Sequence, residues 1–173
     1  AAQDKQLIDF GLRRAQTFGA LHASRSAVIG GFDSSSNVYS AYNFGFKSTG
    51  TMAHSWVQAF KTELEAFREF VISYPETSVL LVDTYNTLKS GVPNAIKVAK
   101  EMEKRGEKLL GIRIDSGDLA YLSKQTRKML DNEDLQYVLI FVSNQLDEYV
   151  IKSLLNQDSP IDGFGVGTSL ITG

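Results

Sequence analysis

The sequence predicts an α/β protein with parallel strands. Apolar runs alternate with segments of helical periodicity along the 173 residues, and strand followed by helix recurs about five times. Residues 79–82 and 138–142 are apolar on both faces, as expected for strands covered by helices on each side. No linker or low-complexity stretch interrupts the pattern, so residues 1–173 are expected to form one domain.

The expected strands and helices follow in order along the chain. The strands are predicted over residues 6–13, 47–52, 78–83, 109–115, 137–143 and 161–167. The helices are identified by apolar residues at spacings of three and four. They cover residues 21–29, 37–44, a segment with Trp56, Phe60, Leu64, Phe67 and Val71 on one face, and then 92–105, 119–130 and 146–156.

Composition excludes several classes of function. The net charge of −2 gives no bulk attraction to nucleic acid or to anionic membranes, so neither is an expected partner. Cysteine is absent and histidine occurs twice, which argues against thiolate chemistry and against zinc sites. Mg²⁺ held by carboxylates and substrate phosphates remains open. No run of about 18 apolar residues and no signal peptide is found, so a cytoplasmic location is expected.

The length suggests that the chain is part of a longer protein. It starts without Met and stops soon after a glycine-rich segment. An α/β barrel usually needs about 250 residues. We therefore expect N- and C-terminal parts beyond this sequence.

Candidate functional residues follow the predicted strands. In α/β folds the catalytic groups gather on the loops after the carboxyl ends of the strands. The predicted active mouth is lined by Arg13 and residues 51–55, 83–86, 115–118, 143–147 and 165–168.

His54 is the first candidate. A lone histidine is usually a satisfied core residue, but His54 follows a strand, begins a helix and has the hydroxyls of Thr51 and Ser55 nearby. Unpaired backbone N–H groups at a helix start suit phosphate. The open roles are phosphoryl acceptor, general acid or base, and phosphate contact.

Arg113 and Asp115 are two residues apart on a strand and so point to the same face. They are either a surface pair or part of the mouth, where arginine would clamp a carboxylate or phosphate. Asp115 and Asp118 suit a ribose hydroxyl or a metal. Asp83 either contacts substrate or metal, or caps the next helix.

Three alternating glycines, Gly163, Gly165 and Gly167, end the last predicted strand and precede Thr168. They either let backbone N–H groups approach a phosphate or mark turns. The sequence lacks a GxxxxGK loop, a GxGxxG fingerprint and a GxSxG elbow, which removes the common nucleotide-binding and hydrolase interpretations.

An ordered set of motifs then resembles one family, the nicotinate phosphoribosyltransferases, over essentially the whole chain. The motifs are residues 9–16, 30–33, 36–38, 50–56 (Gly-Thr-Met-Ala-His-Ser-Trp), 82–85, 111–121, 143–144 and 165–168. The resemblance implies the irregular, TIM-like α/β barrel of the type II phosphoribosyltransferases. Residues 1–173 would be its central portion.

The resemblance also implies a reaction in NAD biosynthesis. Phosphoribosyl passes from phosphoribosyl pyrophosphate to nicotinate, giving nicotinate mononucleotide and pyrophosphate, coupled to ATP hydrolysis through a phosphohistidine, with Mg²⁺ on the pyrophosphate. By resemblance His54 carries the phosphoryl group, and Thr51 and Arg113 contact nicotinate. The remaining substrate contacts fall on Arg13, Asp83, Asp115, Asn144, Gly165, Gly167 and Thr168.

The resemblance also implies that Ser36 favours nicotinate over nicotinamide. Relatives that use the amide are similar in having an Asp near this position, which accepts the amide N–H bond, whereas this chain has a hydroxyl. The chain departs from the family at Gln145 and Asn86, where an Asp is frequent. A nicotinamide-using enzyme and an inactive barrel fragment are the alternatives. The resemblance further implies a homodimer in which the neighbouring subunit completes the site.

Overall fold

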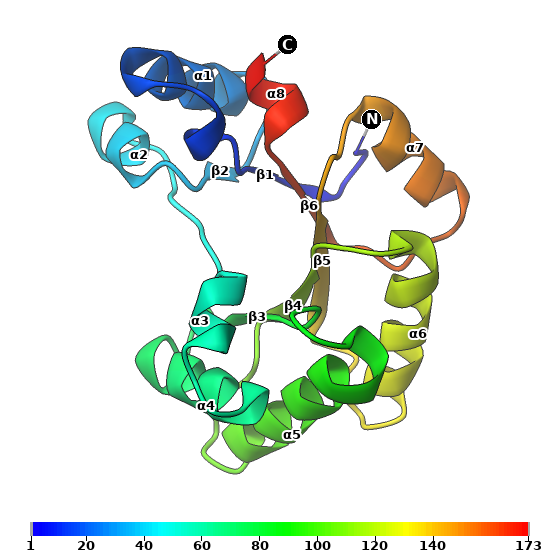
Figure 1. Ribbon diagram of the computed structural model, residues 1–173. Coiled ribbons are helices and arrows are strands. Elements are labelled where there is room, and N and C mark those ends of the chain that lie inside the picture. Colours follow the sequence, from blue (N-terminus) through cyan, green and yellow to red (C-terminus); the bar gives the residue numbers. More distant parts are fainter. Residues whose placement is uncertain (1, 173) are drawn as a thin grey trace. The chain divides into compact units, whose positions relative to one another are not determined.

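The computed structural model describes residues 2–172, which alternate between strands and helices (Figure 1). The chain divides into two compact units. The central unit is Thr51–Phe141, and the terminal unit combines Ala1–Gly50 with Val142–Gly173. Each unit contains a parallel strand pair, so the predicted α/β fold with parallel strands is confirmed.

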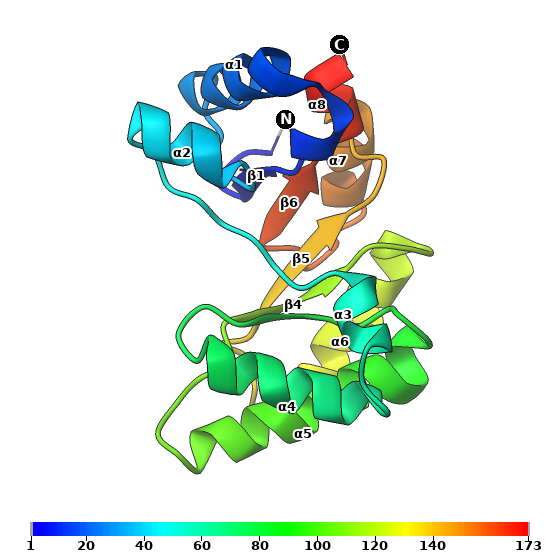
Figure 2. The same ribbon diagram turned by 60° about the vertical axis from the view of Figure 1, so that its left-hand side comes forward.

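In the terminal unit, β1 (Gln6–Asp9) pairs in parallel with both β2 (Ser34–Ser35) and β6 (Gly163–Val166). Helices α1 and α2 pack side by side, as Figure 2 shows. The helices of this unit are η1 (Leu12–Arg14, 3₁₀), α1 (Thr17–Ile29), α2 (Val38–Phe44), α7 (Glu148–Asn156) and α8 (Thr168–Thr172).

In the central unit, β3 (Val79–Leu81) pairs in parallel with β4 (Gly111–Ile114), and Leu139 at the start of β5 (Leu139–Ser143) donates its N–H to the Leu110 carbonyl. β5 begins in this unit and ends in the terminal one. The helices are α3 (His54–Gln58), α4 (Glu63–Ser73), η2 (Thr87–Gly91, a π-helix), α5 (Val92–Glu103) and α6 (Leu119–Asp131).

The core of the central unit explains why β3 is apolar on both faces. Leu80 and Leu81 point to opposite sides of the sheet and both are fully buried. At the end of the strand the backbone packs against η2, since a Cβ on Gly91 would lie 1.7 Å from the Val82 carbonyl oxygen. Only glycine fits this contact, which fixes the loop between β3 and α5 at both ends.

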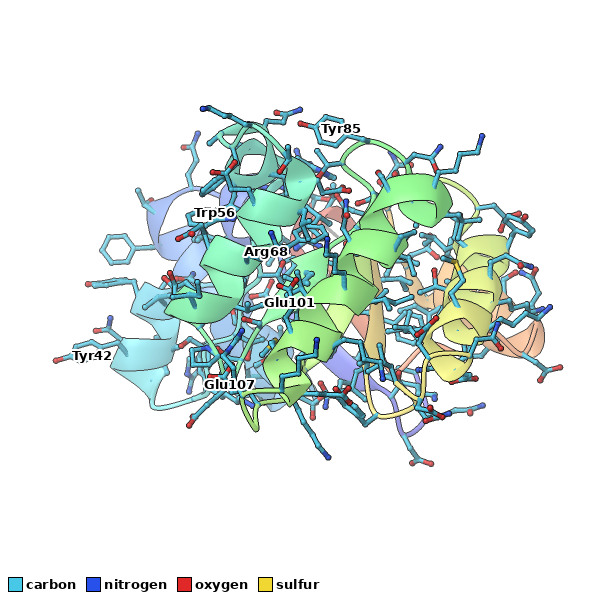
Figure 3. The ribbon with its side chains drawn as sticks, turned by 90° about the horizontal axis from the view of Figure 1, so that it is seen from below. Tyr42, Trp56, Arg68, Tyr85, Glu101 and Glu107 are labelled. Atoms are coloured by element: carbon cyan, nitrogen blue, oxygen red, sulfur yellow. The ribbon has the colours of Figure 1, made fainter. Side chains whose placement is uncertain are left out.

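Helices α4 and α5 lie side by side and are joined by an ion pair. Figure 3 shows Arg68 of α4 facing Glu101 of α5, with Nε and Nη2 donating to the two carboxylate oxygens at 2.9 and 2.6 Å. This fork geometry lowers the pKa of Glu101. The pair links α4 to α5 where the two helices pack together.

Three sequence predictions of local structure are wrong. Residues 47–52 do not form a strand; the described part of this segment makes a single bridge, Ser35 to Ser48. The helix expected through 56–71 is two helices, because Thr62 caps α4 by accepting the Glu65 N–H. The first strand ends at Asp9 rather than at residue 13, where η1 has already formed.

Within residues 2–172, every helix is too short or too polar to cross a lipid bilayer.

Candidate active site

Two acidic residues lie side by side where β3 and β4 end. The strands are paired with Leu81 opposite Arg113, so Asp83 and Asp115 follow neighbouring carboxyl ends. Asp83 Oδ2 accepts hydrogen bonds from the Asp115 N–H at 2.9 Å and from the Ser116 hydroxyl. The Asp83 side chain is 1% exposed, and its Oδ1 has no hydrogen-bond partner within residues 2–172. One oxygen of Asp83 is therefore structural, and the other is left for a further group.

His54 faces these acids from the first position of α3. Its Nδ1 lies 3.1 Å from the Thr84 hydroxyl, and its Nε2 lies 3.6 Å from Asp115 Oδ2 and 3.9 Å from Asp83 Oδ1. The side chain is 39% exposed. An imidazole with a hydroxyl on one nitrogen, carboxylates on the other and access to solvent is not a core histidine.

Arg113 extends the same site on β4. Its side chain is half-buried, and Nη1 donates to the Thr51 hydroxyl just before α3. We call Thr51, His54, Asp83, Thr84, Arg113 and Asp115 the His54 cluster; all six belong to the central unit. The cluster brings a cation, an imidazole and two acids together within one compact unit.

Two neighbouring polar residues are helix caps. Asp118 Oδ1 accepts the Tyr121 N–H at 3.0 Å and starts α6, and Asn86 Oδ1 accepts the Lys89 N–H at 2.9 Å and starts η2. The sequence left open whether Asp83 caps the next helix; in the structure it caps neither η2 nor α6. In the loop that follows β3, Asn86 therefore caps η2, whereas the side chain of Asp83 faces His54.

A cavity of about 400 Å³ adjoins the cluster and shares Asp83 with it. The rest of its lining comes from the loops after β3 and β4, including Asn86, Lys89, Ser116 and Gly117. Residues 2–172 contain no group of three His, Asp or Glu side chains placed to hold a metal. Asp83 and Asp115 together still fit Mg²⁺ of the kind bound through one or two carboxylates plus substrate phosphates.

The terminal unit has a buried polar relay that the sequence analysis missed. Asp9, fully buried, accepts hydrogen bonds from the Ser35 hydroxyl at 2.6 Å and the Gly11 N–H at 2.7 Å. The Ser35 hydroxyl accepts the Asn37 N–H at 2.9 Å. These bonds fix the turn that carries Ser36. A buried acid at the end of an apolar strand was the available signal.

The other predicted residues of this unit also follow strand ends. Arg13 is exposed in η1 after β1, and Thr168 is exposed at the start of α8 after β6. Because Asp9 pairs with Val166 in a parallel register, both residues follow the same end of the sheet. Asn144 is exposed after β5 and has a left-handed backbone, with φ of 92°.

Gly165 and Gly167 have a packing reason to be glycine. A Cβ on Gly165 would lie 2.3 Å from the ring of Phe10, and one on Gly167 would lie 3.3 Å from the Phe10 carbonyl oxygen. The two glycines thus let β6 lie close to the end of β1. Their predicted approach to a phosphate stays a prediction.

Two parallel strands that carry an arginine and are each followed by an acid, with a histidine facing them from the start of a helix, define an α/β protein with a charged site. The model of the nicotinate phosphoribosyltransferase (NAPRTase) family matches residues 5–172, and the chain belongs to this family.

Individual relatives agree with the family assignment. The chain is 47% identical over 170 residues to a nicotinate phosphoribosyltransferase of Bacillus subtilis, covering 98% of this chain and 34% of that protein. It is also 47% identical over 172 residues to one of Mycobacterium tuberculosis, covering 99% and 36%. The crystal structure of the human nicotinic acid phosphoribosyltransferase superposes with a TM-score of 0.85 at 29% identity, covering 94% of this chain and 43% of that one. The chain thus spans about a third of the length of these curated relatives.

Proposed function

We propose that the full protein is a nicotinate phosphoribosyltransferase that makes nicotinate mononucleotide and pyrophosphate in NAD biosynthesis. The observation that carries the proposal is the His54 cluster, which joins an exposed imidazole to two acids and an arginine at adjoining strand ends. Family membership supports the choice of reaction.

Arg113 would bind the carboxylate of nicotinate. A guanidinium pairs with a carboxylate through two parallel hydrogen bonds, and the contact to Thr51 orients it from the side. This leaves the pyridine nitrogen free to attack the ribose C1. The half-buried position of Arg113 strengthens the attraction relative to a fully solvated pair.

The phosphoribosyl transfer itself calls for stabilised charge. Departure of pyrophosphate leaves a ribose with oxocarbenium character, which a nearby carboxylate stabilises. Asp115 suits this task because its backbone N–H donates to Asp83. This hydrogen bond fixes the loop that carries Asp115. Mg²⁺, when bound through Asp83 or Asp115, would neutralise charge on the departing pyrophosphate.

ATP would act through His54. The ring is accessible, belongs to the first turn of a helix and has an acid partner, which are the features of an activated nitrogen nucleophile. Phosphorylation of His54 would then favour the productive complex, and its hydrolysis would couple ATP to synthesis.

The terminal unit would hold the phosphoribosyl group. Arg13 and Thr168 supply a cation and a hydroxyl after paired strands, and Ser36 carries no negative charge that would repel a carboxylate. Asn144, Gly165 and Gly167 complete the proposed contacts. We further propose that the whole protein forms the irregular α/β barrel, works as a homodimer and is located in the cytoplasm.

The test is a product assay on the full-length protein. Nicotinate, phosphoribosyl pyrophosphate and Mg²⁺ should give nicotinate mononucleotide, with a faster rate when ATP is added. Nicotinamide in place of nicotinate should react poorly. Preference for nicotinamide would support the nicotinamide-using alternative, and absence of any product would favour an inactive barrel.

A further inference from the structure

Asp9 uses its two carboxylate oxygens to hold two different turns of the terminal unit. Oδ1 accepts the Gly11 N–H at 2.7 Å, in the turn between β1 and η1, the short helix that contains Arg13. Oδ2 accepts the Ser35 hydroxyl at 2.6 Å, at the end of β2 and directly before Ser36. The acid is fully buried, and burial of a charge is costly unless hydrogen bonds compensate for it. No step of the proposed reaction uses Asp9, so an acid at this position calls for another explanation.

Both neighbours of Ser36 are buried and anchored. Ser35 donates to Asp9, and its hydroxyl oxygen accepts the Asn37 N–H at 2.9 Å. The side-chain oxygen of Asn37 accepts the Ser40 N–H at 3.0 Å and so caps α2, which packs beside α1 (Figure 2). Ser36 itself is half-buried, and its N–H donates to the Asp9 carbonyl at 2.8 Å. The position of Ser36 therefore depends on a chain of hydrogen bonds that begins at Asp9.

We propose that Asp9 is a positioning residue for the pyridine site: through Ser35 it holds Ser36 where nicotinate binds. The inference rests on the proposed function, in which Ser36 lies at the pyridine carboxylate. A hydroxyl can donate to an ionised carboxylate, which only accepts. Such a contact contributes most to affinity when the loop is fixed before the substrate arrives, because ordering a loop on binding costs free energy. A charged acceptor suits this task, since its hydrogen bonds are roughly twice as strong as neutral ones.

The two oxygens of Asp9 act on different substrate contacts. Oδ1 holds the turn toward Arg13, which would contact the phosphoribosyl group, whereas Oδ2 holds the turn of Ser36. A backbone N–H can only donate, so asparagine in place of Asp9 would keep its carbonyl oxygen on Gly11 and turn its NH₂ group toward Ser35. The Ser35 hydroxyl would then have to accept, and its own proton would lose its acceptor. Asp9→Asn therefore weakens the Ser36 turn and spares the Arg13 turn.

The experiment measures steady-state synthesis of nicotinate mononucleotide by the full-length protein and by its Asp9→Asn and Ser35→Ala variants. The nicotinate KM should rise about tenfold in each variant, the effect of one hydrogen bond to a charged group. The KM for phosphoribosyl pyrophosphate and kcat should each stay within about twofold of wild type, because the Arg13 turn and the reacting groups do not change. Ser123→Ala is the matched control. Ser123 is also a fully buried serine and donates to the Ala120 carbonyl at 3.1 Å in α6, so its loss should leave the nicotinate KM unchanged even where it lowers Tm.

The double variant tests whether Asp9 and Ser35 act through their shared contact. If they do, its nicotinate KM should stay about tenfold above wild type, whereas independent effects would multiply to about a hundredfold. A wild-type nicotinate KM in either single variant, a multiplied effect in the double variant, or an equal rise in the KM for phosphoribosyl pyrophosphate overturns the inference while the proposed function stands. If Ser35→Ala shows no cooperative thermal transition, Asp9→Asn alone decides by the same KM values. Absence of product from the wild-type protein removes the proposed function and this inference together.

Discussion

Replacing Arg113 with alanine should weaken the binding of nicotinate selectively. The guanidinium is half-buried and oriented by the Thr51 hydroxyl, so little reorganisation precedes its pairing with a carboxylate. Hydrogen bonds to a charged group contribute about 1.5–3 kcal/mol, and each 1.4 kcal/mol is tenfold in affinity. The nicotinate KM should therefore rise about 10- to 150-fold.

The assay is steady-state synthesis of nicotinate mononucleotide by the full-length protein at saturating phosphoribosyl pyrophosphate. Arg113→Lys should fall between wild type and alanine, because lysine keeps the charge and loses the fork geometry. Arg105→Ala is the control, since Arg105 is an exposed cation whose partner is Glu107 at 2.7 Å. A nicotinate KM for Arg113→Ala within twofold of wild type would refute the assignment of the carboxylate site.

Three other predictions follow from the structure. His54→Ala should abolish the acceleration by ATP and leave slow phosphoribosyl transfer, measured as product formed with and without ATP; equal loss of both rates would mean a structural histidine. Gly91→Ala should lower the free energy of unfolding by about 1–3 kcal/mol, because a Cβ there overlaps the backbone after β3. The measurement is urea denaturation, and the control is Gly19→Ala, where a Cβ meets no atom within 4 Å. A Gly91→Ala protein as stable as wild type would contradict the packing. Burial and the nearby Glu103 carboxylate raise the pKa of Tyr137 from 10.0 to about 12, so its contribution to stability is complete below pH 10 and is lost as pH rises through about 12; Tyr137→Phe should flatten the fall in stability over that range, and parallel curves would argue against it.

The buried strands could be predicted well from the sequence, because burial on both faces requires an unbroken apolar run. β3 and β5 are short, largely apolar runs, and burial on both faces leaves few other interpretations. Asp83 and Asp115 of the His54 cluster were also within reach, since both follow strands that the sequence predicted correctly. Thr51 and His54 were selected as residues at the end of a strand that does not form. The helix break was readable as well: Thr62 and Glu65 have the spacing of a capping box.

Other features depend on contacts distant in sequence. β2 is only Ser34 and Ser35, and no apolar pattern marks it. It pairs with β1 and places Ser35 to donate to the buried Asp9, 26 residues earlier. The prediction of a strand over residues 47–52 failed for the opposite reason: among residues 2–172, this segment pairs with a strand only through the bridge from Ser48 to Ser35. Tertiary pairing decided both cases.

The hydrogen bonds from Asp115 and Ser116 to Asp83 connect the loop after β4 to the loop after β3, which are distant in the sequence. An engineer who transplanted either loop from a homologue alone would mismatch the acid and its donors. Loop exchange between family members should therefore succeed when both segments come from the same parent. Natural drift in one segment would likewise constrain which changes the other can accept.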